Sequence, residues 1–279
     1  MSTVSESRPH VILWGVAKPP NAPSSSGFCQ KLEAFLRFSG ISYELGETVP
    51  RKAPKGKVPF ANIRHDGKTV TVADSHFIIC YLVENGLVKD PDTIADLTPV
   101  QKGESRAWQA YIEEVLYSAI VRDRWYIDEN YAVTAGEIFG SMTWPVRPVL
   151  SWFFRRKVTQ AIWNAGMGRH SQEDAQSLQK EAFEALEARM SGHLYFHDTE
   201  QPTRIDLTIY GFLANTLATN GNPYWADMVL RSSTLLEFTK RMTTLLFPEY
   251  ELLLRRIEEA VSGSSDHGSA STSSVCSLE

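Results

Sequence analysis

The chain has 279 residues, 43% hydrophobic and 22% charged, and carries a formal net charge of −5. This length supplies enough residues for one large domain or two smaller ones, and the acidic balance argues against a nucleic-acid partner. The cysteines Cys29, Cys80 and Cys276 are far apart in the sequence. Their spacing argues against a disulfide framework or a zinc site and favours a reducing compartment. We therefore expect a cytoplasmic protein without a metal.

The sequence shows no signal for entry into a membrane. Residues 1–10, MSTVSESRPH, lack the basic and apolar regions of a signal peptide. The most apolar stretch, MTWPVRPVLSWFF at 142–154, is broken by Arg147 and two prolines and is too short to span a bilayer. The cations RRK follow at 155–157, so contact with a membrane surface is one alternative. We expect instead that this stretch begins a buried helix.

The first third of the chain alternates strand and helix patterns. The expected elements are a strand at 10–17, a helix from about 28 to 40, a strand at 41–47, a hairpin at 58–73 with Asp66-Gly67 as its turn, and a helix at 74–86. A basic, proline-rich loop precedes the hairpin. This order predicts a compact domain at 10–86, in which helices cover a sheet.

The remainder of the chain is helical by pattern. Residues 87–98 contain two prolines and little periodicity, which predicts a linker. Apolar residues at helical spacing between 99 and 261 predict an all-helical domain. Residues 1–9 and the Ser/Gly-rich residues 262–279 are expected to be disordered. The chain ends in the prenylation-like spacing CSLE, but glutamate is a poor last residue for that modification of Cys276.

Two polar motifs in the second domain favour structural roles. Thr203 and Asp206 have the spacing of a capping box at a helix start. In GMGRHSQED at 166–174, glycines end one helix and Ser171 with Asp174 begins the next, so His170 is not expected to contact substrate.

Three motifs carry a resemblance to a known family. They are GKVPF at 56–60, VADSHFIICYL at 72–82 and PTRIDLTIYG at 202–211. The first resembles the cis-proline segment of the thioredoxin fold, the second the turn and helix that bind the γ-glutamyl end of glutathione, and the third a capped helix. In this order they are similar to the glutathione S-transferase superfamily. The implied fold class is α/β plus all-α, with a thioredoxin-like domain followed by an all-helical domain.

A narrower resemblance covers most of residues 10–250. SSSGFCQKLEAFLRFSGISYE, APKGKVPF, GMGRHS and LFPEY are similar to the branch that contains failed-axon-connections and metaxin-like proteins. This branch mixes active enzymes with members that are not known as catalysts. Fungal biosynthetic glutathione transferases, including double-bond isomerases, are a further relative.

The serines before the first helix are candidates for contact with a thiol. A thiolate is the nucleophile, and both a hydroxyl donor and the positive end of a helix dipole favour it. By the resemblance, Ser26-Gly27-Phe28-Cys29 corresponds to a redox C-x-x-C motif, with Ser26 at the nucleophile position. The family usually has proline where Gly27 stands, which leaves Ser24 as a rival. The structural alternative is an ordinary helix N-cap, and Cys29 is expected to be buried and inert.

Five residues are candidates for binding glutathione. The resemblance implies that Val58, before Pro59, pairs its backbone with the cysteinyl unit, and that Lys57 meets the glycyl carboxylate. It also implies that Asp74 and Ser75 bind the γ-glutamyl ammonium and carboxylate at a helix N-terminus. The alternatives are that Pro59 only opens a strand, that Lys57 is solvated and that Asp74-Ser75 is a simple cap.

The electrophile pocket is expected between the two domains, where clefts usually form. Its candidate residues are Tyr111, Arg122, Trp125 and Tyr126. Helical spacing favours a core position for Tyr111, whereas the segment RDRWY at 122–126 is expected to follow a helix and to face a ligand.

Three functions compete. The first is an enzyme that adds the glutathione thiolate to a small hydrophobic electrophile, or that isomerises an E/Z double bond in secondary metabolism by reversible addition. The second is a non-catalytic, metaxin-like adaptor. The third, a thiol reductase acting through Cys29, is disfavoured by Ser26. Related enzymes commonly form homodimers, so a homodimer is also considered.

Overall fold

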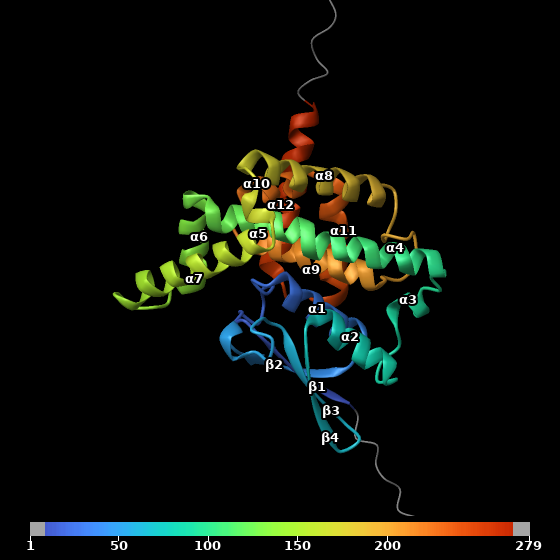
Figure 1. Ribbon diagram of the computed structural model, residues 1–279. Coiled ribbons are helices and arrows are strands. Elements are labelled where there is room, and N and C mark those ends of the chain that lie inside the picture. Colours follow the sequence, from blue (N-terminus) through green and yellow to red (C-terminus); the bar gives the residue numbers. More distant parts are fainter. Residues whose placement is uncertain (1–8, 270–279) are drawn as a thin grey trace, which may run out of the picture.

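The computed structural model describes residues 9–269. They form two domains, one built on a β-sheet and one all-helical (Figure 1). The strands are β1 (His10–Gly15), β2 (Ser42–Glu47), β3 (Phe60–His65) and β4 (Lys68–Ala73). Their order in the sheet is β2-β1-β3-β4, with β1 parallel to β2 and antiparallel to β3. The expected β-α-β-β-β-α order is confirmed.

Two helices of the first domain lie between the sheet and the helical domain (Figure 1). They are α1 (Gly27–Phe38) and α2 (Ser75–Glu84). Alternate residues of β1 and β3 face the core, so Val11, Ala61 and Ile63 are buried with Leu32 and Phe35 of α1. The helices α1 and α2 follow β1 and β4, which are both antiparallel to β3, so the N-termini of the two helices lie at the same end of the sheet.

The second domain is all-helical, as expected. Its helical segments are α3 (Pro91–Ile94), α4 (Pro99–Ala110), η2 (Tyr111–Leu116), α5 (Tyr117–Tyr126), α6 (Asp128–Phe139), α7 (Val146–Asn164), η3 (Met167–Arg169), α8 (Gln172–Met190), α9 (Arg204–Ala218), α10 (Pro223–Arg231), α11 (Ser233–Leu246) and α12 (Glu251–Ser269). The first domain also contains a short 3-10 turn, η1 (Pro50–Lys52). Among the described residues, no helix is both long and apolar enough to cross a bilayer.

The structure differs from the expected boundaries in two places. The linker at 87–98 contains the single-turn helix α3, whose N-cap Asp90 accepts a hydrogen bond from the backbone of Asp92. The helix α12 continues to Ser269, past the expected end at 261. Residues 1–8 and 270–279, including Cys276, lie outside the described residues.

A π-helical turn, η2, connects α4 to α5. Its wider winding adds a residue to the turn, so the helical positions beyond it shift relative to a regular 3.6-residue period. The turn places Glu113 toward the first domain. Such turns are frequent at functional sites.

The two domains meet where α1 packs on α9. The contact is close because Gly211 faces the backbone of α1. A Cβ at this position would lie 2.6 Å from the backbone nitrogen of Lys31. On the other side of the contact, a Cβ at Gly27 would lie 2.9 Å from the Phe212 ring. Any larger residue at position 27, including the proline that the resemblance implies, would require the Phe212 ring to shift.

The start of α9 is buried with its capping box. Asp206 accepts hydrogen bonds from the backbone and hydroxyl of Thr203 and from the backbone of Phe196. Burial raises the pKa of Asp206 to about 6, and these three bonds oppose that effect. The expected capping box is confirmed.

Candidate functional site

The junction of β4 and α2 contains a buried hydroxyl without a partner. Ser75 is 1% exposed, and within residues 9–269 its Oγ makes no hydrogen bond. Beside it, the exposed Asp74 caps α2 by accepting a bond from the backbone of His76 at 2.9 Å. A buried hydroxyl that lacks a partner is costly. Together with the free N–H groups of the α2 N-terminus, it therefore suits an anionic ligand.

The segment before β3 lies against this junction. The carbonyl oxygen of Pro59 accepts a hydrogen bond from the Asp74 backbone at 3.1 Å, and the Val58–Pro59 peptide bond is cis. Val58 is half-buried, and neither its N–H nor its C=O has a hydrogen-bond partner among the described residues. Lys57 is exposed. The structure thus brings Val58, Pro59, Asp74 and Ser75 together.

Ser26 is the N-cap of α1. Its Oγ accepts a hydrogen bond from the backbone of Cys29 at 3.4 Å, and the side chain is half-buried. The structural role expected for this serine is therefore present. Its O–H is still able to donate to a ligand at the positive end of the α1 dipole.

Ser24 has a different environment from Ser26. It is 1% exposed, and its Oγ accepts a bond from the backbone of Ser26 at 3.2 Å. Its own N–H donates to the Gln30 side chain, and its carbonyl accepts from Asn215 of α9. These three bonds fix the loop that carries both serines.

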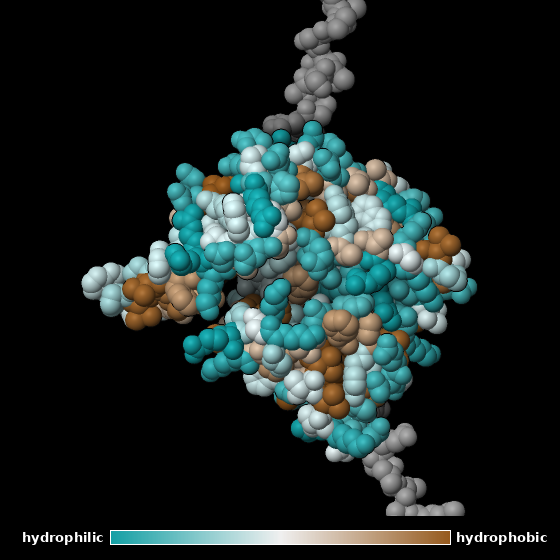
Figure 2. All heavy atoms as spheres, in the orientation of Figure 1, coloured by the Kyte–Doolittle hydropathy of each residue, from teal (hydrophilic) through white to brown (hydrophobic). Residues whose placement is uncertain are grey.

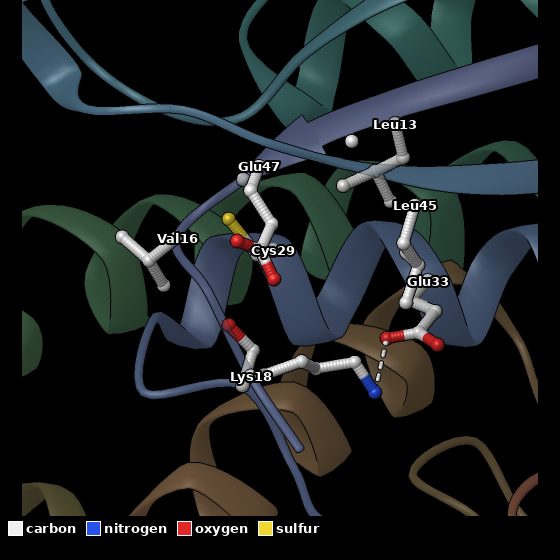
Figure 3. Close-up of a pocket in the computed structure, with 10 residues that line it drawn as sticks. Leu13, Val16, Lys18, Cys29, Glu33, Leu45 and Glu47 are labelled. Carbon is white, nitrogen blue, oxygen red and sulfur yellow. Dashed lines mark ion pairs between the residues drawn. The ribbon is translucent and has the colours of Figure 1, made fainter. Parts of the chain in front are cut away.

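A small cavity lies between the end of β1, α1 and β2 (Figure 3). Its volume of about 60 Å³ leaves room for a few water molecules and none for a tripeptide. The Cys29 sulfur and the ion pair of Lys18 with Glu33, 3.1 Å apart, line it. Burial raises the pKa of the Cys29 thiol, which disfavours the nucleophilic thiolate.

Charged side chains surround the Ser75 junction from α1, α4 and η2. Lys31, 2% exposed, forms an ion pair with Glu113 at 2.5 Å, and Gln109 donates to the same carboxylate. Burial lowers the pKa of Lys31, and the neighbouring Glu113 opposes this effect. Burial also lowers the pKa of His76, with Arg106 contributing to the decrease.

Sequence reasoning missed this charged group. In α1, the sequence does not single out Lys31, because its burial depends on α9 packing across it. For Glu113, the π turn displaces the side chain from its expected helical position. An acidic pair at 113–114 within an amphipathic helix was the one signal present.

The four candidate pocket residues do not form one group. Tyr111 is half-buried, with its ring edge-on to Trp108 at 5.9 Å. The expectation that the segment 122–126 follows the helix is wrong, because it lies inside α5. Arg122 donates to the backbone carbonyl before α8, Trp125 is 7% exposed in an apolar cluster, and Tyr126 donates to a carbonyl of α7. All three are engaged by packing within the helical domain.

Comparison with known proteins identifies the family. The model of the glutathione S-transferase N-terminal domain matches residues 27–130, and that of the C-terminal domain matches residues 179–242. The chain is 26% identical to Failed axon connections of Drosophila melanogaster, over 89% of this chain and 60% of that protein. It is 24% identical to a Metaxin-1 homolog of Caenorhabditis briggsae, over 74% of this chain and 64% of that protein. The chain thus spans less than two thirds of the length of these relatives.

Solved structures show the same fold. The β-etherase LigF from Sphingobium sp. strain SYK-6 superposes with a TM-score of 0.55 at 18% identity, over 88% of this chain and 99% of that chain. Rice GST1 in complex with glutathione superposes with a TM-score of 0.54 at 15% identity, over 95% and 99%. The two family models and these relatives confirm the resemblance found in the sequence motifs. The chain belongs to the glutathione S-transferase superfamily, on its metaxin-like branch.

Proposed function

We propose that the chain binds glutathione at the α2 N-terminus and adds its thiolate to a small hydrophobic electrophile. The observation that carries this proposal is the Ser75 hydroxyl, buried and unpaired within the described residues, beside the unpaired backbone of Val58. The two unsatisfied groups match two parts of one peptide ligand. Solved relatives with the same fold include one bound to glutathione.

Each part of glutathione has a partner in this proposal. The γ-glutamyl carboxylate accepts from the Ser75 hydroxyl and from N–H groups of α2, while its ammonium pairs with Asp74. The cysteinyl backbone pairs with the N–H and C=O of Val58, as a peptide adds to a strand edge. Lys57 is exposed and able to reach the glycyl carboxylate.

Ser26 is the proposed thiol contact. It is half-buried at the α1 N-terminus, whereas Ser24 is almost fully buried and engaged by its own loop. The Ser26 hydroxyl and the helix dipole favour the thiolate, whose proton goes to solvent. The sulfur then forms a bond to an electrophilic carbon of a conjugated double bond, whose π bond breaks as its electron pair moves onto the conjugated acceptor. Across a conjugated double bond this addition is reversible, so rotation and elimination of the same thiolate return glutathione and an isomerised product.

A non-catalytic adaptor is the second candidate function. It is supported by the metaxin and Failed axon connections proteins, to which the chain is similar. In this case the unpaired Ser75 would bind a carboxylate of a protein partner and no glutathione. Homodimer formation and a cytoplasmic location are compatible with either function and stay predictions.

Calorimetric titration with glutathione tests the proposal. We expect saturable binding of glutathione at millimolar concentrations or below. Ser75→Ala should weaken this binding strongly. Ser25→Ala, which changes an exposed residue of the loop before α1, should leave it unchanged. Displacement of chloride from chlorodinitrobenzene by glutathione then measures transferase activity. If the folded protein does not bind glutathione, the proposed transferase function is wrong and the adaptor function is supported.

A further inference from the structure

The segment 140–164 projects from the helical domain. Figure 1 shows α7 and the loop before it extending away from the other helices. We call this segment the α7 arm. One side of α7 is anchored, because Leu150, Phe154, Val158 and Ile162, spaced by four residues, pack with α5 and α6. The opposite side has no such partner.

The unanchored side of the α7 arm is apolar. Among described residues, nine of the eighteen exposed large hydrophobic side chains lie between 133 and 163. Those on the arm are Met142, Trp144, Val146, Val149, Trp152, Phe153 and Trp163, and we call them the arm's apolar face. Trp144 is 84% exposed and Trp152 61%. Figure 2 shows hydrophobic spheres on the projection at the left of the molecule.

Positive charge surrounds this face. No Asp or Glu occurs between Glu137 and Glu173, whereas the same stretch contains Arg147, Arg155, Arg156, Lys157 and Arg169. This concentration of positive charge stands out in a chain with a net charge of −5.

The cations of the arm and the nearby Arg169 are available for an external partner. Arg155 pairs with Asp128, but within the described residues the other four have no ion-pair partner. Two of them lie directly at the apolar face: the Lys157 ammonium is 4.8 Å from the centre of the Phe153 ring, and the Arg169 guanidinium is 5.9 Å from that of Trp163. A helix does begin in this stretch, at Val146, but the expectation that it is buried is wrong, because only one of its sides is packed.

We propose that the α7 arm binds the surface of an anionic phospholipid bilayer, with its apolar face inserted at the headgroup boundary. Tryptophan is favoured at this boundary because its ring is apolar and its N–H is polar. Lysine and arginine beside an apolar face are attracted to anionic headgroups. This surface is separate from the Ser75 junction, so the proposal does not depend on glutathione binding.

The charges argue against a second copy of the chain as the occupant. A two-fold contact through the apolar face would place the same patch on both copies. The unpaired cations of one copy would then face those of the other, which is repulsive. A membrane surface with negative headgroups removes that conflict.

Vesicle co-sedimentation with the full chain tests this assignment. We expect binding to phosphatidylcholine vesicles that contain phosphatidylserine, weaker binding to phosphatidylcholine alone, and a decrease with added salt. The double variant Trp144→Ser/Trp152→Ser should lower the partition coefficient at least about tenfold, as should Arg156→Glu/Lys157→Glu. Val100→Ser and Leu252→Ser remove equally exposed apolar side chains elsewhere and should bind as the unmodified chain does.

Three results would overturn the proposal. The first is failure of the unmodified, folded chain to bind the anionic vesicles, and the second is binding that neither double variant weakens. The third is a dimer in sedimentation velocity that Trp144→Ser/Trp152→Ser dissociates, which would assign the apolar face to a second copy. Circular dichroism of each variant confirms that it is folded, and vesicle-induced quenching of tryptophan fluorescence by brominated lipid gives an independent measure of insertion.

Discussion

The Lys31 ammonium and the Glu113 carboxylate form an ion pair, 2.5 Å apart, across the boundary between α1 and η2. The two side chains are only 2% and 11% exposed. Because water is largely excluded, each charge depends on the other for its stabilisation. The pair therefore couples the two domains beside the Ser75 junction.

Removal of one partner should be strongly destabilising. Glu113→Leu leaves the Lys31 ammonium buried without its counter-charge, and we expect the free energy of unfolding to fall by about 3–5 kcal/mol. Urea denaturation measures this change. The exposed neighbour Glu114→Leu is the matched control. The double variant Lys31→Met/Glu113→Leu should recover most of the loss, and equal instability of the double and single variants would contradict this account.

Ser75→Ala should separate ligand binding from stability. Its hydroxyl has no partner within the described residues, so its loss should change the free energy of unfolding by less than about 0.5 kcal/mol. Ser232 is equally buried but caps α11 through the backbone of Leu235, so Ser232→Ala should cost about 1 kcal/mol. Thermal unfolding of both variants provides the comparison. A large loss in Ser75→Ala would assign that hydroxyl a structural role.

Ser26→Ala should change both the fold and the thiol chemistry. The lost cap of α1 should cost about 1 kcal/mol. If Ser26 donates to the glutathione sulfur, the pKa of the bound thiol rises, so the rate of addition should reach its plateau at higher pH. Ser24→Ala should lower stability and leave this profile in place. An unshifted profile in Ser26→Ala would place the thiol contact elsewhere.

Asp206 should make the free energy of unfolding depend on pH. Burial raises its pKa from an ordinary 3.8 to about 6, so between these values the folded state binds more protons than the unfolded state. The contribution of this group is complete below about pH 4 and is lost as pH rises through about 6. The deficit of Asp206→Asn relative to the unmodified chain should therefore be larger at pH 4 than at pH 7. Urea denaturation across this range measures it, and a deficit independent of pH would refute the assignment.

Gly211→Ala should disturb the domain boundary. The added Cβ would lie within 3 Å of backbone atoms of Lys31 and of Gly27, and backbone cannot rotate away as a side chain can. We expect a loss of about 1–3 kcal/mol in the free energy of unfolding. Gly103→Ala, at an exposed helical position with open space around it, should raise the free energy of unfolding by about 0.4–1 kcal/mol. Equal melting temperatures for the two variants would contradict the close contact.

Much of the fold was accessible from the sequence because its signals are local. The apolar run of the first strand, the Asp66-Gly67 turn and the capping residues at Asp74 and Thr203 act within a few residues, and the structure contains the strand, the hairpin and the two capped helices that they predict. The candidate roles of Val58 and Ser75 came from the family resemblance, and only the structure shows that both are unpaired among the described residues.

The remaining features depend on contacts between distant segments. The burial of Lys31 requires α9, and the position of Glu113 requires a π turn, which apolar spacing at a 3.6-residue period does not predict. The apolar stretch at 142–154 suggested burial by its composition, yet the domain supplies a partner for only one of its sides. Composition alone does not say which neighbours a helix has.

The hydrogen bond from Asn215 of α9 to the carbonyl of Ser24 has an evolutionary consequence. It ties the loop before α1 to the helix that also packs along α1, so the first domain does not by itself set the position of its serines. A chimera that joins the first domain of one relative to the helices of another would displace this loop unless the residue at 215 were transferred too. The two halves of the chain are therefore expected to change together at these positions.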